Sequence, residues 1–245
     1  MNTSNPALSE KVFSSAGISA SQPMTLQGTI NKTFYLLLFV CLSGSYTWSK
    51  AQSNPSAAIG WAVGGMIIGT IFFFITFFKP QWSAITGTGY AVAEGLVLGA
   101  VSVMYETRFH GIVLQAVMLT VGVLLAMLGL YTTRIVQPTQ KFMLGVKAAT
   151  GGILLVYIAT WVLGFFHIEI PYIHGSGLVG IGFSVFVVII AALNLIINFG
   201  IIEHGVANRA PKYMEWYSGF GLLVTLVWLY LEILTLLSKL ASRRD

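Results

Sequence analysis

Seven long apolar stretches with few charges dominate this sequence and limit what it can fold into. Hydrophobic residues make up 56% of the 245 residues and charged residues only 9%, which is too little charge to cover a water-soluble domain. A helix of about 20 apolar residues crosses the roughly 30 Å hydrocarbon layer of a bilayer. The sequence therefore predicts an all-α membrane protein, a bundle of seven transmembrane helices with spans at 33–49, 57–78, 84–105, 112–131, 144–166, 177–199 and 218–239.

The segments outside the spans are short and mostly polar. Residues 1–23 are rich in Ser, Asn, Gly and Pro and lack the apolar core of a signal peptide, so they are predicted to form a flexible tail. Residues 24–240 form the transmembrane domain, and its first part, 24–32, predicts a short interfacial lead-in. Residues 241–245 make a short basic tail. The longest predicted connection, 200–217, has about 18 residues and leaves no room for a soluble catalytic domain.

The distribution of lysine and arginine predicts the orientation, because cytoplasmic loops carry an excess of basic residues. Eight fall on the side of the N-terminus: Lys11, Lys32, Lys79, Arg134, Lys141, Lys147, Arg209 and Lys212. Five fall on the other side: Lys50, Arg108, Lys239, Arg243 and Arg244. This favours a cytoplasmic N-terminus. The net charge of +5 reflects loop anchoring, so the lipid bilayer is an expected partner and nucleic acid is not.

Two acids interrupt the apolar spans. Glu94 lies near the middle of the third span, and Glu232 lies about 6 Å past the centre of the last one if the rise is helical. Charge at that depth is costly, so an ionisable residue there is a functional candidate. Burial favours the neutral carboxyl unless a cation holds the charged form.

Two amides accompany these acids. Asn194 and Asn198 are four residues apart and therefore share one face of the sixth span. Carboxylate and amide oxygens are hard ligands of the kind that Ca²⁺ accepts, whereas clustered Cys or His for zinc is missing. The four residues are thus candidates for an ion pathway or gate. The structural alternative is that Asn194 and Asn198 join helices by hydrogen bonds and that each Glu is a neutral packing acid.

Other polar residues lie near span ends. The four histidines do so: His110, His167, His174 and His204. A mixed-charge loop, predicted to be solvated or to face headgroups, contains Glu203, His204, Arg209, Lys212 and Glu215. Nucleophile elbows, His-Glu-x-x-His and phosphate-binding glycine loops are missing, so no enzymatic activity is expected.

Small residues predict where helices approach one another closely. Overlapping Gly-x-x-x-Gly pairs occur in the second span, and another pair lies beside Glu94. The glycines are Gly60, Gly64, Gly65, Gly69, Gly95 and Gly99. We expect these to be helix-packing faces, with a self-dimerising face as the alternative.

Several short motifs resemble the Bax inhibitor family of transmembrane proteins, and its bacterial branch in particular. The run from Ala93 to Gly99 is similar to the Glu-Gly-x-x-Leu-Gly stretch of that family. Glu215-Trp216-Tyr217 and the run from Trp228 to Leu234 resemble its closing helix, and residues 24–33 resemble its lead-in. The resemblance covers about residues 24–240 and implies a seven-helix bundle whose last helix is central.

The resemblance also implies a mechanism. Members of the family carry one acid on each of the last two helices, and these acids share a proton and gate a calcium leak by pairing with a basic residue. The acid of the closing helix corresponds to Glu232, whereas the other position falls on Asn198. An amide does not titrate, so a pH response must depend on Glu232, Glu94 or both. Asn198 is instead expected to donate a hydrogen bond to Glu232.

The sequence thus predicts a pH-modulated cation leak in the bacterial inner (plasma) membrane, passing calcium ions or protons. It requires no cofactor, and Glu232 and Asn198 would contact calcium transiently. The alternative is a non-conducting regulator that binds a membrane protease or another membrane protein through its loops and tail.

Overall fold

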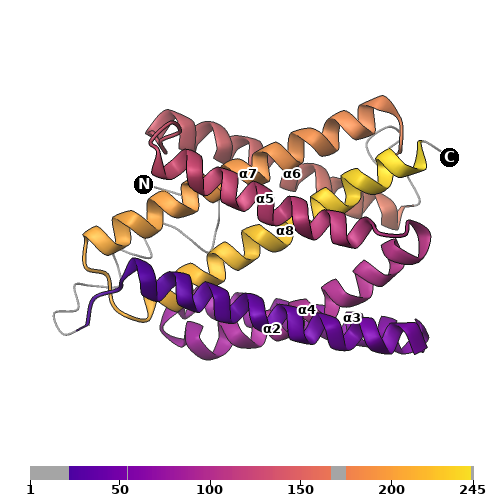
Figure 1. Ribbon diagram of the computed structural model, residues 1–245, viewed down its shortest axis with the longest axis horizontal. Helices are drawn as coiled ribbons and strands as arrows, with labels where there is room; N and C mark the ends of the chain where they lie inside the picture. The colour runs from indigo at the N-terminus through magenta and orange to yellow at the C-terminus, as the bar shows by residue number, and fades with distance from the viewer. Residues whose placement is uncertain (1–21, 54, 167–174, 244–245) are drawn as a thin grey trace. The chain divides into compact units, whose positions relative to one another are not determined.

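The computed structural model describes residues 22–53, 55–166 and 175–243 (Figure 1). The predicted tail before residue 22, together with His167 and His174, lies outside this part of the chain. Across the described residues the protein is helical: α2 (Leu26–Ser53), α3 (Pro55–Phe78), η1 (Pro80–Trp82), α4 (Ser83–Arg108), α5 (Ile112–Thr132), α6 (Gln140–Phe165), α7 (Leu178–Ala207) and α8 (Met214–Ser242).

These helices confirm the predicted all-α membrane fold. Within the described ranges, six helices, α3 to α8, are long and apolar enough to cross a membrane. The helix α2 has 28 residues but is less apolar, because polar residues occupy both its first two turns and its second half. The predicted lead-in is not a separate element, since α2 begins at Leu26 and continues through the first predicted span.

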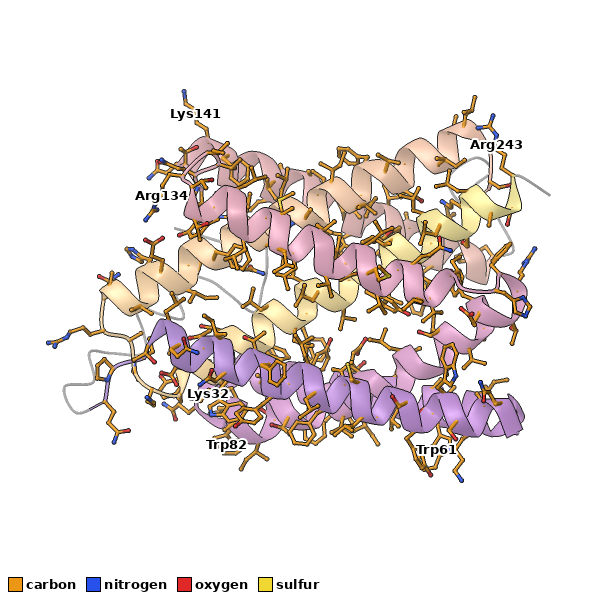
Figure 2. The ribbon with its side chains drawn as sticks, viewed as in Figure 1. Lys32, Trp61, Trp82, Arg134, Lys141 and Arg243 are labelled. Carbon is orange, nitrogen blue, oxygen red and sulfur yellow. The ribbon has the colours of Figure 1, made fainter. Side chains whose placement is uncertain are left out.

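The chain folds as two compact units. The first contains α2, α3, η1, α4, the end of α7 from Gly200 and the start of α8 up to Val224. The second contains α5, α6, the first part of α7 up to Phe199 and α8 from Thr225. In the second unit, Arg134 and Lys141 lie at the turn between α5 and α6, whereas Arg243 lies at the opposite end, where α8 ends (Figure 2).

Close glycine contacts hold the first unit together. A methyl group on Gly99 would overlap the backbone oxygen of Gly44 in α2, and one on Gly65 would lie 2.7 Å from the backbone oxygen of Ala93. Helices α2 and α3 therefore both pack on α4 at positions where only hydrogen fits, as the small residues predicted. Gly64 behaves differently, since no described atom lies within 4 Å of a methyl group placed there.

The connection between α7 and α8 is shorter than the sequence predicted. It runs from residue 208 to 213, because α7 continues to Ala207 and α8 begins at Met214. Arg209 turns the chain with a left-handed φ of 53°, and the Met24 amide donates to the Ala210 carbonyl at 2.7 Å. This turn thereby binds the residues that lead into α2.

The last helix is the most buried of the spanning helices. In the most apolar stretch of α8, 67% of the residues are buried, compared with 17% of the residues in the corresponding stretches of α3, α5 and α6. Tyr217, Phe220 and Leu223 are fully buried in the first unit, and Leu229 and Leu234 in the second. Since α8 contributes to both units, its buried residues form part of the core of each.

Candidate functional site

Glu232 is a buried carboxyl of α8 in the second unit, with an exposed fraction of 7%. The Tyr157 hydroxyl from α6 donates to Glu232 Oε1 at 2.7 Å, and the Trp228 indole N–H, one turn earlier on α8, donates to the same oxygen at 3.1 Å. An indole N–H is a donor only, so Oε1 acts as an acceptor. Glu232 Oε2 is consequently the oxygen at which a proton or a cation would be taken up.

Two further polar residues share this face of α8. Thr225, Glu232 and Lys239 are spaced seven residues apart, which is about two helical turns, or about 10.5 Å, at each step. Thr225 Oγ1 accepts a hydrogen bond from Asn198 Nδ2 at 2.8 Å, and Lys239 Nζ donates to Ser184 Oγ at 2.9 Å. We call these three residues of α8, with their hydrogen-bond partners, the polar column.

The polar column keeps α7 and α8 in register. Asn198 and Ser184 are separated by fourteen positions on α7, as Thr225 and Lys239 are on the antiparallel α8. Glu232 lies midway and is therefore level with position 191 of α7, a fully buried alanine.

The two asparagines of α7 are both buried but face different partners. Asn194 Nδ2 donates to Thr150 Oγ1 of α6 at 2.9 Å, whereas Asn198 Nδ2 donates to Thr225 of α8 rather than to Glu232. Asn198 is fully buried, and its Oδ1 has no hydrogen-bond partner among the described residues. An unpaired buried carbonyl oxygen is costly, and it is a point at which a water molecule or a cation is favourably bound.

Glu94 belongs to the first unit. It is half-buried on α4, and it forms a side-chain hydrogen bond with Tyr90, one turn earlier on the same helix. A methyl group on Gly69 of α3 would lie 3.8 Å from Glu94 Oε2, so the carboxyl sits against the α3 backbone where that helix lacks a side chain. Tyr90 is itself buried against Phe220 of α8.

The family model described as Bax inhibitor 1 like matches residues 5–242, nearly the whole chain. The chain belongs to the Bax inhibitor family. No curated protein and no solved structure matched it.

In this Bax inhibitor chain the position expected for a second acid is Asn198. Asn198 binds a threonine hydroxyl in the polar column. Among the residues that define the column, Glu232 has the one carboxyl group and Lys239 the one amino group. Thr225, which binds Asn198, lies two helical turns before Glu232 on α8. The joint contact of Asn198 and Glu232 with calcium stays a prediction. Within the described ranges, no group of three or more His, Cys, Asp or Glu side chains lies close enough together to hold a metal ion.

Sequence reasoning missed part of this site. In the sequence, Lys239 counted only among the basic residues on the side opposite the N-terminus, but its side chain is buried, with 8% exposed. Tyr157 and Ser184 carried no sequence signal of their own. The signal that could have identified Lys239 is its spacing, since it lies seven residues after Glu232 and so on the same face of one helix.

The prediction that Glu215 is solvated was wrong. Its side chain is fully buried at the start of α8, where Oε1 accepts from the Thr25 amide at 2.8 Å and from the Thr25 hydroxyl at 2.9 Å. Lys32 of α2 forms an ion pair with Oε2, and Lys212 lies 3.4 Å from Oε1. A methyl group on Gly28 would overlap this carboxyl. Glu215 therefore joins the first turns of α2 and α8, where helix dipoles favour a negative charge.

Proposed function

We propose that this protein conducts cations, calcium among them, across the membrane, and that protonation of Glu232 modulates the flux. The observation that supports the proposal is the burial of Glu232 in an apolar unit, with its Oε1 fixed by two uncharged donors. A carboxyl in such a place binds a cation when charged and releases it when protonated.

The other candidates have defined roles in this proposal. Asn198 Oδ1 offers a second oxygen, two helical turns from Glu232 along the polar column, to a cation that has lost part of its water shell. Glu94, with Tyr90 as its donor, supports a cation path in the first unit. No catalytic step and no bound cofactor is part of the proposal.

The proposed location is the bacterial inner membrane, with a cytoplasmic N-terminus. The excess of basic residues in the loops on the side of the N-terminus supports this orientation. The sequence assigns Arg134 and Lys141 to that side, and the two residues lie together at the turn between α5 and α6 (Figure 2).

The test is calcium flux into dye-loaded liposomes across about pH 5 to 8, because protonation removes the charge of a carboxyl. Wild type is compared with Glu232→Gln, which keeps the shape of the side chain but does not titrate. Glu203→Gln is the matched control, because it removes an exposed acid from α7. We expect pH-dependent flux from wild type and from the control, and a loss of the pH dependence in Glu232→Gln.

Two results would count against the proposal. Flux with the same pH dependence in Glu232→Gln would show that this acid does not modulate conduction. A folded wild-type protein without flux at any pH would overturn conduction itself, and would favour regulation of a membrane protease or another membrane protein.

A further inference from the structure

The polar column contains an element that conduction by itself does not require: the buried lysine of α8. We infer that Lys239 is a tethered cation that sets the charge selectivity of the column by limiting the entry of divalent cations. This inference rests on the proposed conduction and adds to it the residue that discriminates between ions.

The contacts of Lys239 fix its position. Its Nζ donates to the Gly180 carbonyl at 3.1 Å and to the Ser184 hydroxyl at 2.9 Å, both in the first two turns of α7. These two bonds hold the ammonium at the end of the second unit where α7 begins and α8 ends. A buried lysine that donates hydrogen bonds to two groups of another helix is a fixed charge, unlike a surface lysine that moves freely in water.

Lys239 and Glu232 are neighbours along the polar column, since Glu232 lies two turns N-terminal to Lys239 on the same face of α8. The bond to Gly180, which lies one turn before Ser184 on the antiparallel α7, keeps the ammonium at the outer end of the column. At this spacing the opposite charges of an ionised Glu232 and of Lys239 attract each other. Lys239 also lies in the last turn of α8, where the helix dipole favours a positive charge.

The position of Lys239 has a consequence for ion entry. A cation that approaches Glu232 from this end of the column passes the ammonium, and the repulsion that it meets is proportional to its own charge. Calcium therefore meets twice the repulsion that potassium meets. An uncharged side chain of similar length would remove this difference and leave Glu232 in place.

The experiment compares calcium and potassium flux in liposomes loaded with dyes for each ion. The variants are Lys239→Met, Lys239→Gln and Lys239→Arg, and the control is Lys141→Gln, which removes an exposed charge from the same unit. Gln at position 239 keeps a donor for Ser184, so it serves if the apolar variant does not fold. Gel filtration and thermal unfolding establish that each variant is folded.

We expect Lys239→Met and Lys239→Gln to raise the ratio of calcium to potassium flux by about fivefold, from the loss of one charge about 10 Å from the acid. Lys239→Arg and Lys141→Gln should keep the wild-type ratio. A conducting wild type with unchanged ratios in both neutral variants would overturn this inference and leave the proposed function intact. Absence of flux in the wild type, together with flux in the neutral variants, would support Lys239 as the barrier. Absence of flux in the wild type and in all variants would overturn both proposals.

Discussion

Replacing Glu215 with alanine should release the start of α2 from the start of α8. The carboxyl of Glu215 is fully buried, receives two hydrogen bonds from Thr25 and pairs with Lys32. Alanine would leave the Thr25 amide without its acceptor and Lys32 without its counter-ion, and the side chain of Lys32 is only 18% exposed.

The expected magnitude follows from these contacts. Removal of one partner from a buried ion pair costs about 3–5 kcal/mol, and the partial exposure of Lys32 selects the lower end of that range. A local cost of about 3 kcal/mol corresponds to about a hundredfold change in an opening equilibrium. Glu215→Gln keeps one oxygen for the Thr25 amide, so about half of that cost is expected.

Hydrogen exchange of the detergent-solubilised protein measures this opening directly. Amides in the first turns of α2, Leu26 to Thr33, should exchange about a hundredfold faster in Glu215→Ala than in wild type, and amides in the middle of α8 should not change. Glu203→Ala, which removes an exposed acid of α7, is the control. Unchanged exchange in the first turns of α2 would refute the view that Glu215 holds these helices together.

Two further predictions concern helix packing and the polar column. Gly99→Ala should lower the free energy of unfolding by about 1–3 kcal/mol in thermal or denaturant unfolding, because the added methyl group would overlap the backbone oxygen of Gly44. Gly64→Ala is the control and should be neutral or stabilising, because its methyl group meets open space. Equal effects of the two changes would contradict this packing. Thr225→Val should lower the free energy of unfolding by about 1–3 kcal/mol, because it leaves the buried Asn198 amide group without its acceptor. Adding Asn198→Leu to this variant should recover most of that loss, and simple additivity of the two single effects would show that the hydrogen bond is not the cause.

The spans were predictable because each depends on local composition. A run of about 20 apolar residues is long enough to cross a bilayer and must satisfy its backbone hydrogen bonds internally, so it forms a helix whatever its neighbours are. Glu232 was also predictable, because a carboxyl in such a run is conspicuous without any structure. The close approach at Gly99 followed from the same kind of local pattern.

The partners of the polar residues were not predictable in this way. Glu215 was expected in solvent because its neighbours in sequence are charged, but it is buried by α2, whose first turn lies about 190 residues earlier. Lys239 was expected among the basic residues on the side opposite the N-terminus, but it is buried and donates hydrogen bonds to Ser184 and Gly180 of α7. Neither pairing has a signal within one segment.

By itself the sequence determined that this chain is a helical membrane protein of the Bax inhibitor family, where its helices lie, and which acid stands inside the last span. Tertiary structure decided what surrounds that acid: a tyrosine and a tryptophan as donors, an asparagine with an unpaired oxygen two turns away, and a lysine held by α7. The reason is physical. The hydrophobic effect and backbone hydrogen bonding act within one segment, whereas the state of a buried polar group depends on which faces of distant helices meet.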